Sequence, residues 1–332
     1  MRTSRARQSA ILLAAALVLT ACGGDDGGGD VAAEESGTSS EPLRVITAEQ
    51  YDLPMIGADA GVHLGIFEDA GLNVEVLAGQ EAAQGLASGD VDIAIASPNR
   101  FIGAILEGLE AKLVGPTIDV WGQYVIVRDD LENAQAVDDL KGGRWGVSSF
   151  GSAGHYSVTK LADELGWAEG DFEIVTLGDL EGLQAGLRNG TIDGFAWSAQ
   201  AAFGLEHEGV ARVIGNVGEV IGPNPLDVIA VSSRAIEERP DDIRKFCEGY
   251  YEAQTRFKDD PKLAEKTFIE DWDFDPEVTP RILKAGLPLL STSPDMADEM
   301  FDNMAEATVF TIDGSEVTGD EVRDIYVNCY DL

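Results

Sequence analysis

One stretch of sequence occurs twice in this chain, and the repeat constrains the fold more than any other feature. Leu86–Asp92 reads LASGDVD and Leu187–Asp193 reads LRNGTID, and each precedes a short apolar run. Each copy is typical of the last turn of a helix, a glycine that ends it, an aspartate and a buried strand. Similar helix and strand patterns also precede both copies, so we predict two similar α/β domains that face each other. Such a pair forms a cleft, where small-ligand sites are commonly found.

Strand-like and helix-like segments alternate from Leu43 onwards, which predicts βαβ units and mainly parallel sheets. We expect residues 43–124 and 231–332 to form the first domain and residues 128–227 to form the second. The apolar runs 125–127 and 228–230 lie where the chain would leave the first domain and return to it. We therefore interpret these two runs as hinge strands that connect the domains.

The N-terminal region has the pattern of an exported lipoprotein. Three arginines precede the apolar run Ala10–Leu19, which is about half the ~20 residues that a membrane-spanning helix needs, so residues 1–21 are predicted to be a cleaved signal peptide. Leu19–Cys22 resembles the bacterial lipobox, which predicts a diacylglycerol or palmitate lipid on Cys22. The alternative is an ordinary signal peptide with an incidental cysteine. Residues 22–42 are rich in glycine and acidic residues and are predicted to be a flexible linker that holds the domains at the outer face of the cell membrane.

Charge and cysteine content limit the partners further. The formal net charge of −37 argues against binding to nucleic acid or direct attraction to anionic lipid. Outside the cytoplasm Cys247 and Cys329 can form a disulfide, although two buried free thiols remain an alternative. His63, His155 and His207 lack metal-ligand spacing, so we expect no metal, and we expect no cofactor and no catalytic residues.

Ligands of parallel α/β sheets bind beyond the carboxyl ends of the strands, and this rule selects the candidate site. The loop Gly151–Gly154 is the most specific candidate, because small residues at a helix start present backbone N–H groups to a carboxylate, sulfonate, phosphate or carbonyl oxygen. It lacks the lysine of a P-loop, and Ser152 can also act as an ordinary N-cap. The complete set of predicted ligand-binding residues is Tyr51, Leu53, Pro54, Ser97, Asn99, Trp121, Ser149, Gly151, Ser152, Ala153, Gly154, His155, Trp197 and Asp227.

Several segments together resemble one protein family. Gly65–Val74, Asp138–Val147 followed by Gly151 and Ser152, and the stretch from Ser232 to Pro240 are similar to motifs of the nitrate/sulfonate/taurine-type substrate-binding proteins. That family also includes thiamine-pyrimidine and riboflavin binders. The resemblance runs from about Leu43 to beyond Asp260. It implies a type II periplasmic-binding-protein-like fold and an extracytoplasmic, monomeric receptor that delivers a small molecule to an ABC permease and its ATPase.

The sequence departs from that family at the expected ligand site. Sulfonate and nitrate binders place cationic groups in the cleft, whereas here only Arg100 and His155 lie near the candidate loops. A neutral aromatic or pyrimidine-like nitrogen compound is therefore considered beside a sulfonate-, taurine- or nitrate-like anion. Two other functions stay open at this point: an enzyme similar to thiamine-pyrimidine synthases on the same scaffold, and a sensory module that presents its ligand to a receptor.

Overall fold

A computed structural model describes residues 41–168, 170–311 and 316–332 of the chain. The predicted signal peptide, Cys22 and nearly all of the predicted linker lie outside the described residues. No helix in the described ranges is long and apolar enough to cross a membrane.

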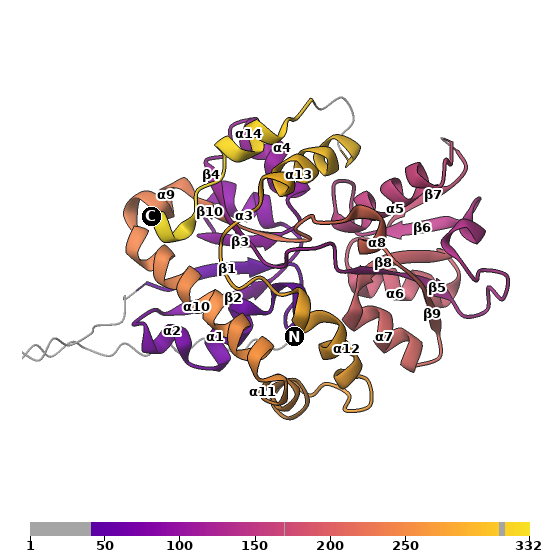
Figure 1. Cartoon of the computed structure of the whole chain (residues 1–332), viewed down its shortest axis with the longest axis horizontal. Coiled ribbons are helices and arrows are strands. Elements are labelled where there is room, and N and C mark those ends of the chain that lie inside the picture. The colour runs from indigo at the N-terminus through magenta and orange to yellow at the C-terminus, as the bar shows by residue number, and fades with distance from the viewer. Residues whose placement is uncertain (1–40, 169, 312–315) are drawn as a thin grey trace, which may run out of the picture. The chain divides into compact units, whose positions relative to one another are not determined.

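The described chain contains two five-stranded sheets with the same topology (Figure 1). The strand orders are β2-β1-β3-β10-β4 and β7-β6-β8-β5-β9, and in each sheet only the fourth strand listed is antiparallel to its neighbours. The prediction of two similar, mainly parallel α/β domains is therefore confirmed. The strands are β1 (Leu43–Thr47), β2 (Val74–Ala78), β3 (Ile93–Ala96), β4 (Ala111–Pro116), β5 (Gln123–Arg128), β6 (Arg144–Val147), β7 (Glu173–Thr176), β8 (Gly194–Ser198), β9 (Ala211–Asn216) and β10 (Val228–Ser232).

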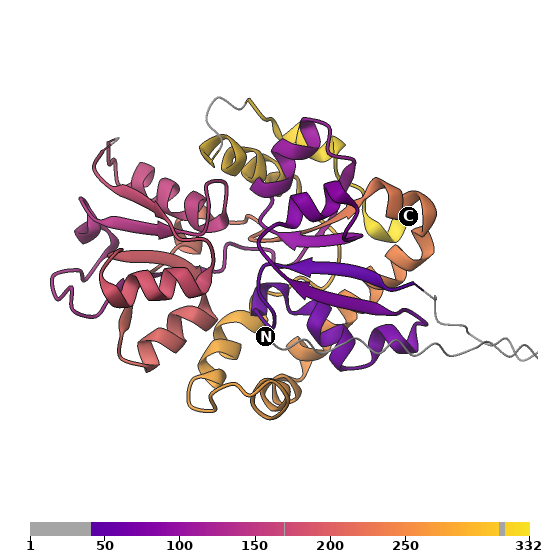
Figure 2. The same cartoon turned by 180° about the vertical axis from the view of Figure 1, so that it is seen from behind.

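Helices cover both faces of the sheets (Figures 1 and 2). Side chains alternate along a strand, so Ile93 and Ile95 of β3 join one apolar cluster while Ala94 and Ala96 join another on the opposite face. The helices are α1 (Gly57–His63), α2 (Ile66–Asp69), α3 (Ala82–Ser88), α4 (Asn99–Leu106), α5 (Ala153–Glu164), α6 (Leu180–Asn189), α7 (Ala199–His207), α8 (Gly218–Ile221), α9 (Ser233–Glu238), α10 (Pro240–Asp259), α11 (Pro261–Lys266), α12 (Thr279–Gly286), α13 (Asp298–Thr311) and α14 (Gly319–Asp324), with shorter turns at Leu53–Met55, Val137–Leu140, Thr267–Asp271, Leu287–Leu289 and Cys329–Asp331.

The repeated sequence performs the same structural task in both domains. Gly89 and Gly190 end α3 and α6 in the left-handed conformation, with φ values of 75° and 76°. The Asp92 carboxylate then accepts a hydrogen bond from the backbone N–H of Arg44 at 3.1 Å, and the Asp193 carboxylate accepts one from Arg144 at 2.9 Å. Asp92 therefore fixes the start of β3 to β1, and Asp193 fixes the start of β8 to β6.

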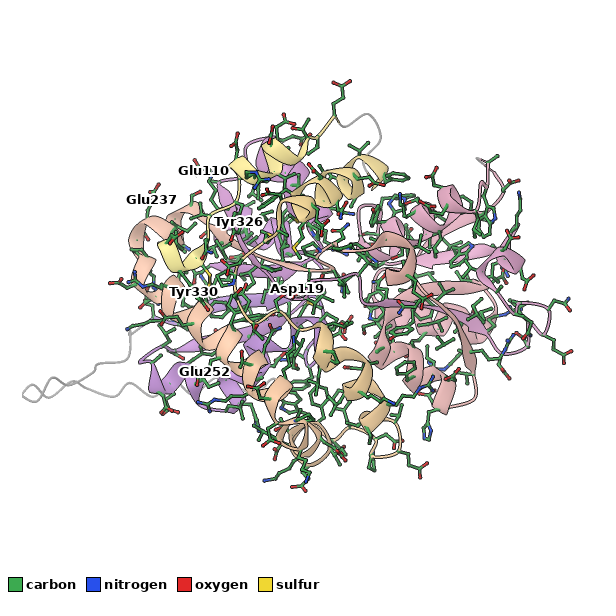
Figure 3. All side chains as sticks on the ribbon, viewed as in Figure 1. Glu110, Asp119, Glu237, Glu252, Tyr326 and Tyr330 are labelled. Atoms are coloured by element: carbon green, nitrogen blue, oxygen red, sulfur yellow. A yellow bond between two sulfur atoms is a disulfide. The ribbon has the colours of Figure 1, made fainter. Side chains whose placement is uncertain are left out.

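The predicted hinge runs lie inside two strands of the sheets. Residues 125–127 lie within β5, which pairs with β8 and β9, and residues 228–230 lie within β10, which pairs with β3 and β4. Both strands have a register shift in these residues, between Val125 and Ile126 and between Ile229 and Ala230. The chain passes between the sheets at residues 117–122 and 217–227, next to these strands, and Asp119 in the first of these connections is labelled in Figure 3.

The C-terminal segment is tied back to the first domain. The structure joins Cys247 of α10 to Cys329 through a disulfide, with the two Cα atoms 6.4 Å apart. Nearby, the Tyr326 hydroxyl donates to the backbone oxygen of Pro294 at 2.8 Å (Figure 3). These contacts hold the chain end against the first sheet, remote from the second.

We predict that Asp92→Ala and Asp193→Ala each lower the free energy of unfolding by about 1–3 kcal/mol, because each leaves a backbone N–H without its acceptor. Asp163→Ala, an exposed position near the end of α5, is the matched control and should change it by less than about 0.5 kcal/mol. Urea unfolding monitored by circular dichroism measures the difference. Equal effects for all three substitutions would contradict a structural role for the repeat.

Candidate functional site

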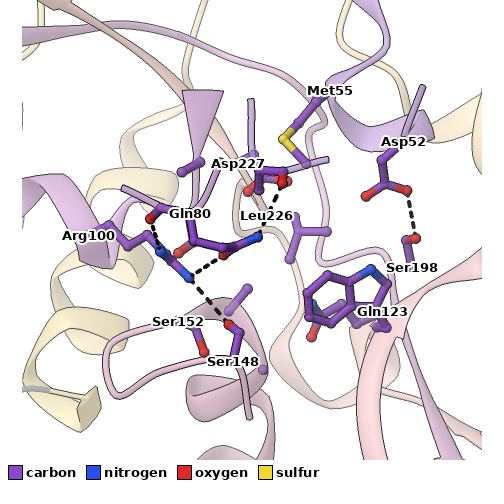
Figure 4. Close-up of a pocket in the computed structure, with 16 residues that line it drawn as sticks. Asp52, Met55, Gln80, Arg100, Gln123, Ser148, Ser152, Ser198, Leu226 and Asp227 are labelled. Atoms are coloured by element: carbon purple, nitrogen blue, oxygen red, sulfur yellow. Dashed lines mark hydrogen bonds between the residues drawn. The ribbon is translucent and has the colours of Figure 1, made fainter. Parts of the chain in front are cut away.

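A pocket lies where the ends of strands from the two sheets meet (Figure 4). The enclosed cavity is small, about 50 Å³, and the space between the lining side chains, including the part open to solvent, is about 450 Å³. The pocket is lined by Ala48, Asp52, Met55, Gln80, Ala96, Ser97, Arg100, Gln123, Ser148, Ser152, Ala153, Gly154, Trp197, Ser198, Leu226 and Asp227.

The topology of the sheets explains why these residues converge. Gln80 and Ser148 follow the parallel strands β2 and β6, so they lie at the carboxyl ends of their sheets. Asp227 and Gln123 lie at the starts of β10 and β5. Because these strands are antiparallel to the others, their starts point to the same edge as the carboxyl ends of their neighbours.

The start of α5 supplies preformed hydrogen-bond donors. The Ser152 hydroxyl accepts from the backbone N–H of His155 at 3.2 Å and donates to the backbone oxygen of Ser149 at 2.7 Å. His155 Nδ1 in turn accepts from the backbone N–H of Gly151 at 3.1 Å, and burial lowers the pKa of His155. Among the described residues, no acceptor is found for the backbone N–H groups of Ala153 and Gly154, which line the pocket.

Arg100 is held in one orientation by hydrogen bonds (Figure 4). Its guanidinium donates to the backbone oxygen of Gln80 at 2.7 Å, to Gln80 Oε1 at 3.0 Å and to the Ser148 hydroxyl at 3.3 Å. Gln80 itself donates to the backbone oxygen of Ala48 at 3.2 Å. Arg100 belongs to the first domain and Ser148 to the second, so this contact spans the pocket.

Two buried carboxylates lie on the first-domain side of the pocket. The Ser198 hydroxyl of the second domain donates to Asp52 Oδ1 at 2.8 Å, but burial still raises the pKa of Asp52 to about 6. Burial, together with the nearby charge of Asp52, raises the pKa of Asp227 to about 7, and the opposite charge of Arg100 only partly offsets this. Among the described residues, no group donates a hydrogen bond to the Asp227 carboxylate.

Further acidic groups surround this pair. Burial, with the charge of Asp52 as the next cause, raises the pKa of Glu49 to about 7. Burial likewise raises the pKa of Asp59 to about 6, although its carboxylate accepts from the backbone N–H of Tyr51 at 3.1 Å. Burial and the charges of Asp227 and Asp59 raise the pKa of Tyr250 well above its usual value. This side of the pocket is therefore strongly negative when all carboxyl groups are ionised.

The structure brings together part of the predicted set. Ser97, Ser152, Ala153, Gly154, Trp197 and Asp227 line the pocket. Asn99, Ser149 and Gly151 line a neighbouring hollow together with the exposed Phe150. In the described part of the chain, the buried Ser97 hydroxyl and Asn99 side-chain amide have no hydrogen-bond partner, which is typical of groups that contact water or ligand.

The other predicted residues are removed from the site because their side chains are used elsewhere. Tyr51 stacks on Trp272 with ring centroids 4.7 Å apart, and Trp121 Nε1 donates to the Ser157 hydroxyl at 2.7 Å in the core. Leu53 and Pro54 line a separate apolar crevice, and His155 holds the loop that precedes α5.

Sequence reasoning left out several pocket residues. Gln80 follows a parallel strand, so the strand-end rule could have found it. Gln123 starts an antiparallel strand, and a rule based on carboxyl ends cannot select it. Asp52 lies between the predicted residues Tyr51 and Leu53. Its side chain is buried, and burial cannot be read from the sequence.

Within the described ranges, no group of three histidine, cysteine, aspartate or glutamate side chains could hold a metal ion.

Comparison with solved structures identifies the class of fold. The alkanesulfonate-binding protein SsuA from Xanthomonas axonopodis pv. citri, bound to MOPS, is 18% identical with a TM-score of 0.72 over 87% of this chain and 100% of that chain. The periplasmic nitrate-binding protein NrtA from Synechocystis PCC 6803 is 14% identical with a TM-score of 0.65 over 86% of each chain. The desulfurization enzyme DszB is 17% identical with a TM-score of 0.57 over 84% of this chain and 95% of that chain. This chain therefore has the two-domain periplasmic binding protein fold.

The family model described as NMT1/THI5 like matches residues 55–264, and the chain belongs to that family. A search of curated proteins finds no match.

We predict that Ser198→Ala lowers the free energy of unfolding by about 1–3 kcal/mol at pH 8, because the buried Asp52 carboxylate loses a donor. The loss should be smaller at pH 4, where the folded protein holds Asp52 in its protonated form, since its pKa is about 6. Ser88→Ala removes a similar bond to the exposed Asp90 and is the matched control, with an effect below about 0.5 kcal/mol at either pH. Urea unfolding at both pH values measures the effects, and a pH-independent loss for Ser198→Ala would contradict the prediction.

Proposed function

We propose that this protein is an extracytoplasmic solute-binding receptor of an ABC importer. In this proposal it is a monomer, anchored by a lipid on Cys22, that delivers a small nitrogen- or sulfur-containing organic compound to a membrane permease with its ATPase. The observation that carries the proposal is the construction of the pocket. Both domains contribute to it, and the contacts Asp52–Ser198 and Arg100–Ser148 form only when the domains are together.

The pocket couples binding to domain movement. A ligand that touches residues of both domains binds the closed arrangement better than an open one, and this difference in affinity drives closure. We place the hinge at the connections 117–122 and 217–227, where the chain crosses between the sheets. The closed form is then the form that the permease recognises.

The composition of the pocket supports binding over catalysis. Its lining contains no histidine or cysteine, whereas an enzyme similar to thiamine-pyrimidine synthases would need both. DszB is an enzyme and has a similar fold, so the pocket rather than the fold carries this argument.

We expect a small molecule to remain bound when the full chain is purified from cells that export it, and denaturation followed by mass spectrometry should release it. Trp197→Ala removes part of the pocket wall and Gly154→Leu fills the pocket, so both should reduce the released compound about tenfold or more. Gly204→Leu is the matched control, because open space surrounds that position in α7. Retention of the same compound by all three variants, or its absence from the wild-type protein, would contradict the proposal.

The lipid anchor has a separate test. We expect Cys22→Ala to move the protein from the membrane fraction to the soluble fraction of exporting cells and to abolish labelling by radioactive palmitate. An unchanged membrane fraction for this variant would contradict anchoring at Cys22 and would leave the ligand-binding role untouched.

A further inference from the structure

The pocket holds more buried negative charge than the protein neutralises. Asp52 and Asp227 are 6% and 7% exposed, and both line the pocket. Among the described residues, no lysine, arginine or histidine nitrogen forms an ion pair within 4.0 Å of either carboxylate. Asp52 has the Ser198 hydroxyl and the backbone of Leu53 as donors, whereas Asp227 has none.

The charge of Arg100 acts on Asp227, but its guanidinium is hydrogen-bonded to other groups. Figure 4 shows its guanidinium hydrogen-bonded to Gln80 and Ser148, away from the space between the carboxylates. Its charge reaches Asp227 only as a longer-range attraction. A buried carboxylate without a partner is costly, and a positively charged group placed beside it would offset that cost.

The opposite side of the pocket has the opposite character. Arg100 and the backbone N–H groups of Ala153 and Gly154 are hydrogen-bond donors in this part of the pocket, and the Ser148 hydroxyl, which accepts from Arg100, lies beside them. An oxyanion could contact these donors, but a ligand that is only anionic would leave the two carboxylates uncompensated. The distribution of charge therefore favours a ligand with a cationic end and an acceptor end.

We propose that the ligand of this pocket carries a positively charged nitrogen group, such as an amine or amidine, that lies between Asp52 and Asp227, with its acceptor atoms toward Arg100 and the start of α5. This inference rests on the proposed receptor function and specifies the class of ligand. It makes Asp227 the residue that selects for positive charge.

Matched pairs of probes test the charge preference with the full chain at pH 8. Taurine and isethionate differ by an amine in place of a hydroxyl, and benzamidine and benzamide differ by a positive charge. The cationic member of each pair should raise the melting temperature more and bind about tenfold or more tightly in calorimetry, which corresponds to about 1.4 kcal/mol. Tighter binding of isethionate, methanesulfonate or nitrate than of the amine and amidine probes would overturn this inference while supporting the receptor function.

A second measurement needs no ligand and tests the inference even if no probe binds. Asp227→Asn removes the charge of Asp227, so its melting temperature should be higher than that of the wild-type protein at pH 8. Folding raises the pKa of Asp227 to about 7. Ionisation of Asp227 therefore lowers the free energy of unfolding increasingly as the pH rises from about 4 to 7. The gain should therefore shrink toward pH 4.

The controls separate charge from shape. Asp227→Ser should show the same sign if charge is responsible, and Asp163→Asn, at an exposed position, should show no pH-dependent gain. The groups coupled to Asp227 are Asp52, Arg100 and Tyr250, and they are the same in all variants. If Asp227→Asn and Asp227→Ser instead lower the melting temperature more at pH 8 than at pH 4, the protein itself satisfies this carboxylate and the inference is overturned.

Discussion

The bond between an aspartate carboxylate and a backbone N–H of the neighbouring parallel strand organises both domains of this protein. Asp92 forms it with Arg44 and Asp193 with Arg144, at the end of each sheet where the parallel strands begin. Because it sets the position of β3 beside β1 and of β8 beside β6, the carboxyl ends of the paired strands reach the same edge of the sheet. The pocket is built at that edge, so its geometry depends on a contact more than one strand length away.

The two antiparallel strands are the second constraint. β5 and β10 each enter a sheet directly after a connection between the domains, and their starts therefore lie beside the pocket. Asp227 reaches the pocket for this reason, next to a connection that we assign to the hinge.

The sequence allowed the two-domain architecture to be predicted because each element has a local signature. Gly89 and Gly190 end helices, and the apolar runs after Asp92 and Asp193 form strands. Local patterns do not specify which way a side chain points. Tyr51 adopts a positive φ of 57° and stacks on Trp272, which is far away in the sequence, and Trp121 turns into the core toward Ser157. The predicted hinge runs 125–127 and 228–230 lie within β5 and β10, and an apolar run looks the same in sequence whether it connects two sheets or completes one.

The central claim is that the pocket receives a positive charge on Asp52 and Asp227. The most direct test is calorimetric measurement of proton exchange at pH 7, with the compound released from the purified protein titrated in buffers of different ionisation enthalpy. A cation lowers the pKa of the Asp227 carboxyl, which is about 7 in the free protein, so binding should release protons into the buffer. Uptake of protons on binding, as an anionic ligand would cause, would contradict the account.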